Sequence, residues 1–238
     1  MRTTCARSST VLADPGTVLE LRPAFAPGMV TALARLDGRP VGVLANDSRH
    51  LGGAVTSDGS DKAARFLALC DAFDLPVVSL VDTPGFMVGP EAEATGLVRH
   101  SSRLFVTAAS LTVPVVSVVL RRAYGLGAQA MMLGSTRSPL LTVAWPSAEL
   151  GAMGVEGAVR LALRRELAAL PDDEQRQALV DAMVEQAHAR GRAVPVATAF
   201  EVDDVIEPAA TRDTVLAVLG SAAPPAARTG RKRVLDPW

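Results

Sequence analysis

A glycine-rich stretch near the middle of the chain has the residue types and spacing to bind an anion. It runs from Arg121 to Met132 and reads Arg-Arg-Ala-Tyr-Gly-Leu-Gly-Ala-Gln-Ala-Met-Met. An apolar run typical of a buried strand, Val113 to Leu120, precedes it, and small and apolar residues that suit a helix follow. Backbone N–H groups at a helix start lack partners and lie at the positive end of the helix dipole. The stretch therefore predicts a site for a phosphate or for a developing oxyanion.

Other interpretations of this turn follow from the same residues. The spacing of Gly125, Gly127 and Ala130 fits the G-x-G-x-x-G/A fingerprint of dinucleotide-binding folds. That fingerprint needs an acidic residue at the end of the next strand, which here ends in Trp145-Pro146, so a nicotinamide or flavin site is disfavoured. A P-loop is excluded, because no Gly-Lys-Ser/Thr follows a glycine-rich loop. Glycines that serve only the close packing of helix on strand stay an open alternative.

A rhythm of strands and helices surrounds the turn and predicts a single α/β domain. Strands are predicted at 29–34, 41–45, 76–82, 114–120, 140–145 and 201–206. The first two are expected to form a hairpin through Asp37-Gly38. Helices are predicted at 58–73, 91–109, 172–189 and from Thr211 onward, and their alternation with strands indicates parallel pairing. Residues 1–15 are expected to form a flexible arm, 16–220 the domain, and 221–238 a flexible basic tail.

Two more glycine loops follow predicted strands. One is Asp82-Thr-Pro-Gly-Phe-Met-Val-Gly89 and the other is His50-Leu-Gly-Gly53. Because open parallel sheets bind ligands at the carboxyl ends of their strands, we expect these loops and the turn at Gly125 to line one crevice.

Composition narrows the classes of function. The 238 residues carry a net charge of −1, which gives no electrostatic case for binding nucleic acid or an acidic membrane surface. No apolar run approaches the length of a membrane span, and Arg2 and Arg7 precede no apolar stretch that would make a signal peptide. Cys5 and Cys70 give neither a disulfide framework nor zinc spacing, so we expect a cytoplasmic protein without a metal site.

Several motifs, taken in their order along the chain, resemble one known family. They are Ser60-Asp-Lys-Ala-Ala-Arg-Phe, Cys70-Asp-Ala-Phe, Asp82-Thr-Pro-Gly-Phe, Arg99-His100, Val113-Pro114, Arg121-Arg-Ala-Tyr-Gly, Ala144-Trp-Pro, Met153-Gly, Glu156-Gly-Ala-Val and Val202-Asp-Asp-Val-Ile-Glu-Pro. This series resembles the carboxyltransferase subunit of biotin-dependent acyl-CoA carboxylases. More narrowly, Gly16 to Leu219 is similar to the C-terminal, biotin-side domain of that subunit.

The resemblance implies a crotonase-type (ClpP/crotonase) spiral of ββα units with helices packed outside. A usual subunit has two such domains, and its active site forms between the acyl-CoA-binding domain of one protomer and the biotin-binding domain of another. This chain resembles only the second domain, so the acyl-CoA half is expected from a separate carboxyltransferase subunit. A biotin carboxyl carrier protein and a homo- or hetero-oligomer are further expectations. Lys62 does not lie in a Met-Lys-Met context, so the chain is not expected to carry biotin itself.

The resemblance also implies roles for individual residues. The amides of Gly127 and Ala128 would form an oxyanion hole for the ureido oxygen, stabilising the biotin enolate during CO2 transfer to an acyl-CoA. The other residues that it assigns to the cofactor and substrate are Gly85, Phe86, Gly89, Gly125 and Ala130. Of these, Ala130 matches a position that helps to choose the acyl chain. The chain departs from the family in reading Tyr-Gly-Leu-Gly-Ala where many members read Tyr-Gly-Gly-Ala, and in having Arg122 for lysine.

The titratable residues leave several alternatives. A structural role is favoured for His100 over that of a general base, and His50 and His188 have less support still. Glu149 and Glu156 resemble the glutamate pair of crotonase-fold hydratases. In those enzymes the first glutamate directly follows the oxyanion residue. Gln129 occupies that place, which argues against hydration.

Two questions stay open. The Arg121-Arg122 pair is equally compatible with binding the phosphates of CoA and with flanking a strand in solvent. For the whole chain, the alternatives are a stand-alone crotonase-fold acyl-CoA decarboxylase or hydrolase, and a non-catalytic assembly subunit.

Overall fold

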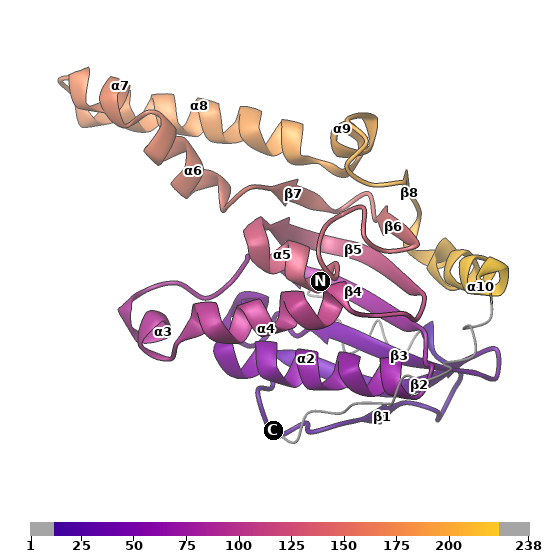
Figure 1. Cartoon of the computed structure of the whole chain (residues 1–238). Coiled ribbons are helices and arrows are strands. Elements are labelled where there is room, and N and C mark those ends of the chain that lie inside the picture. Colours follow the sequence, from indigo (N-terminus) through magenta and orange to yellow (C-terminus); the bar gives the residue numbers. More distant parts are fainter. Residues whose placement is uncertain (1–11, 224–238) are drawn as a thin grey trace.

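The computed structural model describes residues 12–223, which form an eight-stranded sheet flanked by helices (Figure 1). The strands are β1 (Leu19–Glu20), β2 (Met29–Leu36), β3 (Arg39–Asn46), β4 (Val77–Thr83), β5 (Val115–Tyr124), β6 (Leu141–Ala144), β7 (Glu149–Gly151) and β8 (Asp204–Val205). Their order is β1-β2-β3-β4-β5-β6-β8, with β7 paired to the end of β5. The first three strands pair antiparallel and the other neighbours pair parallel, which confirms the α/β class.

The predicted hairpin is present between β2 and β3. Asp37 and Gly38 connect the strands with φ angles of 52° and 72°. Two consecutive residues with positive φ match the right-handed twist of paired strands, so this turn fixes the register of the hairpin.

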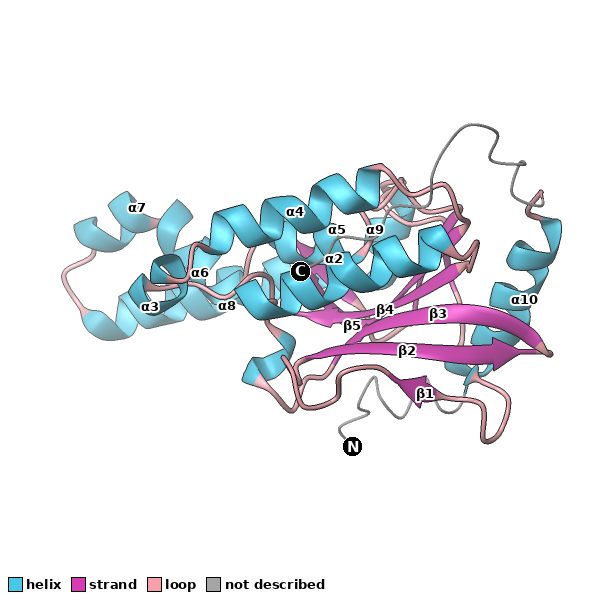
Figure 2. Cartoon of the chain, turned by 60° about the horizontal axis from the view of Figure 1, so that its bottom comes forward, coloured by secondary structure: helices cyan, strands magenta, loops and turns pink. Residues whose placement is uncertain are grey.

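One face of the sheet carries an apolar layer beneath three helices. These are α2 (Ser57–Ala72), α4 (Leu97–Ala109) and α5 (Gly125–Met131). Leu44, Val77 and Val119 point into this layer from three adjacent strands. Figure 2 shows α2 and α4 side by side over this face of the sheet.

The opposite face carries a second layer. Val43, Val78 and Val118 occupy it, each next in sequence to a residue of the first layer, because successive residues of a strand point to opposite faces. Val215 from α10 (Thr211–Ser221) packs against them after the short turn η2 (Pro208–Ala210). The central strands are therefore buried on both sides, which explains their continuous apolar sequences.

Gly42 of β3 marks the closest approach of α2 to the sheet. A Cβ atom there would lie 2.4 Å from Sγ of Cys70 and 3.1 Å from Cζ of Phe66, both fully buried. We expect Gly42→Ala to lower the free energy of unfolding by about 1–3 kcal/mol through overpacking, as measured by denaturant titration. In a Cys70→Ala background, which removes the sulfur, the same substitution should cost less. Equal losses in both backgrounds would contradict this explanation.

Three predicted elements differ from the observed ones. The helix predicted over 91–109 is two helices, α3 (Pro90–Ala94) and α4, because Gly96 between them has a φ of 74°, which ends a right-handed helix. The strand predicted to end at Leu120 continues to Tyr124, since its last residues pair with β7. The strand predicted over 201–206 is only the two-residue β8.

Residues 12–15, assigned from sequence to a flexible arm, belong to the folded part. Ala13 is buried, and the carboxylate of Asp14 accepts hydrogen bonds from the amides of Asp37 and Gly38 at 3.0 and 2.8 Å. The same carboxylate pairs with Arg212 at 2.6 Å. The remainder of the predicted arm, 1–11, and residues 224–238 of the predicted tail lie outside the described residues.

A helical arm follows β7 and projects from the sheet (Figure 1). It consists of α6 (Val155–Ala162), α7 (Arg164–Ala169) and α8 (Asp173–Gly191), and the short α9 (Ala193–Thr198) leads the chain back to β8. A small apolar core joins the arm to the body, formed by Tyr124, Val155, Val159 and Val180. Between residues 12 and 223, no helix is both long and apolar enough to cross a membrane.

Candidate active site

The glycine turn forms the start of α5, which begins directly where β5 ends. Tyr124 occupies the N-cap position without a side-chain cap, and Gly125 follows with a φ of 60°. The amides of the first three helical residues, Gly125, Leu126 and Gly127, have no carbonyl within the helix to bond. This arrangement is the one predicted for an anion or oxyanion site.

The helix start places the two predicted amide donors, Gly127 and Ala128, at different positions of the first turn. Ala128 is the fourth residue of α5, where the amide bonds back to the carbonyl of Tyr124 in the regular helical pattern. The amide of Gly127 has no partner within the helix, and the adjacent amide that also lacks one is that of Leu126, not that of Ala128. The reason is that β5 continues to Tyr124, so that the helix begins at Gly125. The position of this start determines which amides have no hydrogen-bond partner within the helix.

Gly127 is also the point where two glycine loops touch. A Cβ atom at Gly127 would lie 2.4 Å from the carbonyl carbon of Gly85 and 2.5 Å from the nitrogen of Phe86. Gly85 has a φ of 123°, in the range that favours glycine. The loop after β4 therefore supports the start of α5 by backbone contact, as the shared edge of the sheet led us to expect.

A cleft of about 440 Å³ opens beside the start of α5. Its walls come from α5, from β7 and the residue after it, and from the segment around α9. The lining residues are Ala123, Gly125, Leu126, Ala128, Gln129, Met132, Thr136, Leu150, Gly151, Ala152, Val196 and Glu201. The cleft lies next to the first turn of α5, but no residue of the loops at 82–89 and 50–53 lines it, so the prediction of one crevice lined by all three glycine loops is wrong. One of its walls is instead β7, a strand that the sequence did not predict.

Ala130 does not reach this cleft. It is fully buried in the core beneath α5, whereas Gln129 is exposed and lines the cleft. The structure thus places Ala130 in the core and not among the residues that line this cleft. Adjacent residues of a helix point about 100° apart, so a change of one position separates the core from the cleft.

The other predicted wall residues are divided between two places. Phe86 lies partly buried beside Phe105, with ring centroids 6.3 Å apart, close to Gly85 and Gly127. Gly89 is the N-cap residue before α3 and lines a separate, larger hollow of about 660 Å³ together with exposed Val88. The structure therefore joins Gly85 and Phe86 to the start of α5 but not Gly89.

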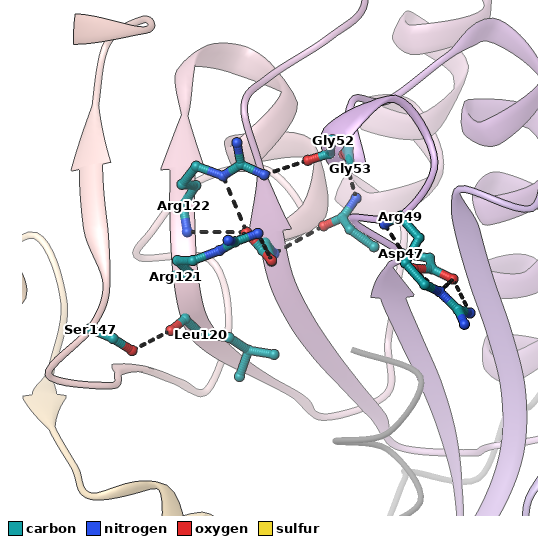
Figure 3. A network of polar contacts seen from close by, with 10 residues as sticks. Asp47, Arg49, Gly52, Gly53, Leu120, Arg121, Arg122 and Ser147 are labelled. Carbon is teal, nitrogen blue, oxygen red and sulfur yellow. Dashed lines mark hydrogen bonds and ion pairs between the residues drawn. The ribbon is translucent and has the colours of Figure 1, made fainter. Parts of the chain in front are cut away.

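The two arginines that precede the turn share one buried carboxylate (Figure 3). Asp82, 1% exposed, bonds Nη2 of Arg121 at 2.9 Å and lies 3.5 Å from Nε of Arg122. Arg122 also donates to the carbonyl of Gly52 at 2.6 Å, in the turn η1 (Leu51–Gly53). Position 53 requires glycine, because a Cβ atom there would lie 2.4 Å from the carbonyl oxygen of Asp82. The arginines, at the end of β5, thus contact the end of β4 and the turn that follows β3. The residues next to them in the sequence did not indicate this role.

A second polar group lies on the other side of the turn. The Nδ1 atom of His188, on α8, contacts Oε1 of Glu149 on β7, and its Nε2 atom lies 3.9 Å from Oε1 of Glu156. Burial, the charge of Glu149 and a hydrogen bond with it raise the pKa of the nearby Tyr124 phenol above its ordinary value. His188 and Glu149 are 39 residues apart, and no local sequence signal could have paired them.

His100, considered from sequence as a general base, has a structural partner instead. Its Nδ1 atom lies 2.7 Å from Asp61 on α2, and Arg103 lies 3.2 Å from the same carboxylate. This group joins α4 to α2 away from the cleft. Over residues 12–223, no three His, Cys, Asp or Glu side chains gather closely enough to hold a metal ion.

Known proteins resemble the chain over most of its length. Residues 9–232 match the family described as carboxyl transferase domain. The 12S subunit of methylmalonyl-CoA carboxyltransferase from Propionibacterium freudenreichii subsp. shermanii is 38% identical over 208 residues, which cover 87% of this chain and 39% of that protein. The chain thus spans about two fifths of the length of this relative.

Two solved structures share the fold. A single-chain, multi-domain long-chain acyl-CoA carboxylase superposes with a TM-score of 0.82 and 50% identity, covering 92% of this chain and 21% of that one. The transcarboxylase 12S hexamer, solved with methylmalonyl-CoA bound, gives a TM-score of 0.84 and 35% identity, covering 97% and 45%. The crotonase-type fold expected from the sequence is confirmed.

Proposed function

Because the chain belongs to the carboxyl transferase domain family, we propose that it is the carboxyltransferase component of a biotin-dependent acyl-CoA carboxylase. The observation that carries the proposal is the family match over residues 9–232 together with an open cleft at the free amides of α5. The substrate is an acyl-CoA, and the cofactor is biotin carried on a separate protein. The sequence has only two cysteines, too few for a disulfide framework, which supports a reducing, cytoplasmic location.

The residues at the start of α5 fit a group that becomes anionic. When bound, carboxybiotin supplies the carboxyl group and a urea oxygen that gains negative charge as the carboxyl group departs. The first turn of α5 has no acidic side chain, so nothing there repels such an oxygen. Fixed amide donors stabilise developing charge without reorganising, and one donor is typically worth about 3 kcal/mol in the transition state.

We assign the two donors to the amides of Leu126 and Gly127. Both lie in the first turn, where the helix leaves its amides free, and Leu126 lines the cleft. The backbone of Gly85 and Phe86 packs directly against Gly127. Gln129, which faces the cleft from the next turn, replaces Ala130 as the residue that contacts the substrate.

The proposal includes partners. A carboxyltransferase subunit that binds the acyl-CoA would supply the other half of the site, and the chain itself matches 39% of the length of the 12S subunit. The related transcarboxylase 12S protein is a hexamer, which supports an oligomer here as well. A biotin carboxyl carrier protein would bring the cofactor to the cleft.

The test is transfer of a labelled carboxyl group. The chain is mixed with candidate acyl-CoA-binding subunits, radiolabelled carboxybiotin and a series of acyl-CoAs, and the labelled acyl-CoA product is counted. We expect product only when chain, partner and carboxybiotin are all present. Turnover of malonyl-CoA by the chain alone, without biotin, would instead support the stand-alone decarboxylase or hydrolase. Binding to carboxylase subunits without any turnover would support the assembly subunit.

A further inference from the structure

Tyr124 connects the helical arm to the start of α5. It is the only tyrosine in the chain, the last residue of β5 and the N-cap of α5. The residue is 6% exposed and packs with Val155 and Val180, which come from α6 and α8. Tyr124 is therefore the residue through which the packing of the arm meets Gly125 and the amides that follow.

The phenol of Tyr124 is held by Glu149. Burial comes first among the causes that raise the pKa of this phenol, and the charge of Glu149 and its hydrogen bonding add to the effect. Glu149 lies on β7, which runs parallel to the end of β5 with Glu149 opposite Arg122 and Tyr124 opposite Gly151. The phenol and the carboxylate are thus brought close by the short pairing between these two strands.

His188 fixes the other side of this carboxylate. It reaches Glu149 from α8, and the two side chains are 35% and 22% exposed. The other charged groups around the pair are Glu156 on α6, 3.9 Å from His188, and Arg122 at the end of β5. The cluster Tyr124, Glu149 and His188 therefore joins three elements, β5, β7 and α8 (Figure 1).

The same β7 segment walls the cleft. Leu150, Gly151 and Ala152 line it, and the carbonyl of Ala152 lies 3.0 Å from where a Cβ of Gly125 would be. On its other side, a Cβ at Gly191, the last residue of α8, would lie 2.8 Å from the carbonyl of Leu150. The backbones of α8, β7 and the start of α5 are therefore in close contact, and we expect a shift of one element to move the others.

We propose that Glu149 and His188 are positioning residues, which hold β7 and Tyr124 so that the cleft wall and the first amides of α5 keep a productive geometry. They do not touch the reacting atoms. The inference rests on the proposed carboxyl transfer for its kinetic consequence, but the coupling to Tyr124 can be measured independently of activity.

The first test reads Tyr124 directly. Fluorotyrosine incorporated into the full chain gives one fluorine NMR signal, because the chain has a single tyrosine. Glu149→Gln and His188→Asn should both move this signal. His100→Asn is the matched control, since it breaks a similar contact between a histidine and a carboxylate, that of Asp61, away from the cleft, and should leave the signal in place. A signal unchanged in both cluster variants would overturn the inference.

The second test reads the reaction. We expect Glu149→Gln to lower kcat of the reconstituted carboxyl transfer about tenfold with little change in KM for the acyl-CoA, because misplaced groups cost rate more than binding. In a Tyr124→Phe background the same substitution should have a much smaller effect, since the hydroxyl is already gone. Equal effects in both backgrounds, or an equal loss in His100→Asn, would contradict the proposed role. If the wild-type system transfers no carboxyl group, the proposed function fails, while the fluorine signal still decides whether Glu149 and His188 fix Tyr124.

Discussion

Replacing Gly127 with alanine is expected to lower kcat for carboxyl transfer by about 10²-fold or more. The new Cβ atom would lie 2.4 Å from the carbonyl carbon of Gly85 and 2.5 Å from the nitrogen of Phe86, so two backbone segments must separate. That movement displaces the amide of Gly127, and the loss of one oxyanion donor typically costs about 10²–10³ in rate. The measurement is steady-state transfer from carboxybiotin with the partner subunit present.

Gly157→Ala is the matched control for this substitution. Gly157 is an exposed helical residue of α6, and a Cβ there would meet only Cε of Met153, at 3.9 Å. Alanine favours a helix over glycine by about 1 kcal/mol, so this variant should be as stable as the wild type or slightly more so, with unchanged kcat. A Gly127→Ala protein that folds normally and turns over at the wild-type rate would remove Gly127 from the mechanism.

Replacing Asp82 with asparagine is expected to cost about 2 kcal/mol of folding free energy. The substitution keeps the size of the side chain but leaves Arg121 and Arg122 without their shared carboxylate. Breaking a fully buried ion pair often costs about 3–5 kcal/mol, but these arginines keep 43% and 31% of their side chains exposed, so water offsets part of the loss. Denaturant unfolding, compared at equal slope, measures the difference.

Asp173→Asn provides the comparison for this ion pair. Asp173 pairs with Arg176 at 2.6 Å on α8, but its side chain is 94% exposed. Exposed pairs contribute roughly 0–1 kcal/mol, so this change should shift stability far less than Asp82→Asn. Similar losses of unfolding free energy in the two variants would mean that burial does not strengthen the pairing of Asp82 with the arginines.

Local sequence patterns predicted the central elements of the fold because their causes act over a few residues. The apolar run before Leu120, the turn at Asp37-Gly38 and the N-terminal acids of α8 each specify a structure through their immediate neighbours. The order of motifs was enough to identify the family, and the glycine turn predicted the helix start at which we propose the site.

Side-chain directions within the site depended on where one helix begins. Because β5 continues to Tyr124 to pair with β7, α5 starts at Gly125. That start frees the amide of Leu126 instead of Ala128, and it turns Gln129 toward the cleft and Ala130 into the core. No pattern within the turn itself contains this information, since the pairing partner, β7, lies well beyond the turn in the sequence.

The sequence by itself determined the α/β class, the family and the glycine turn that leaves amides free, because backbone propensity, apolar periodicity and motif order are local or linear properties. Only the tertiary structure decided that Gly127 lies on Gly85, that Asp82 joins both arginines, and that His188 holds Glu149 beside Tyr124. These contacts join residues that are distant in the sequence, and they form only when packing of the helices and the arm brings separate segments together.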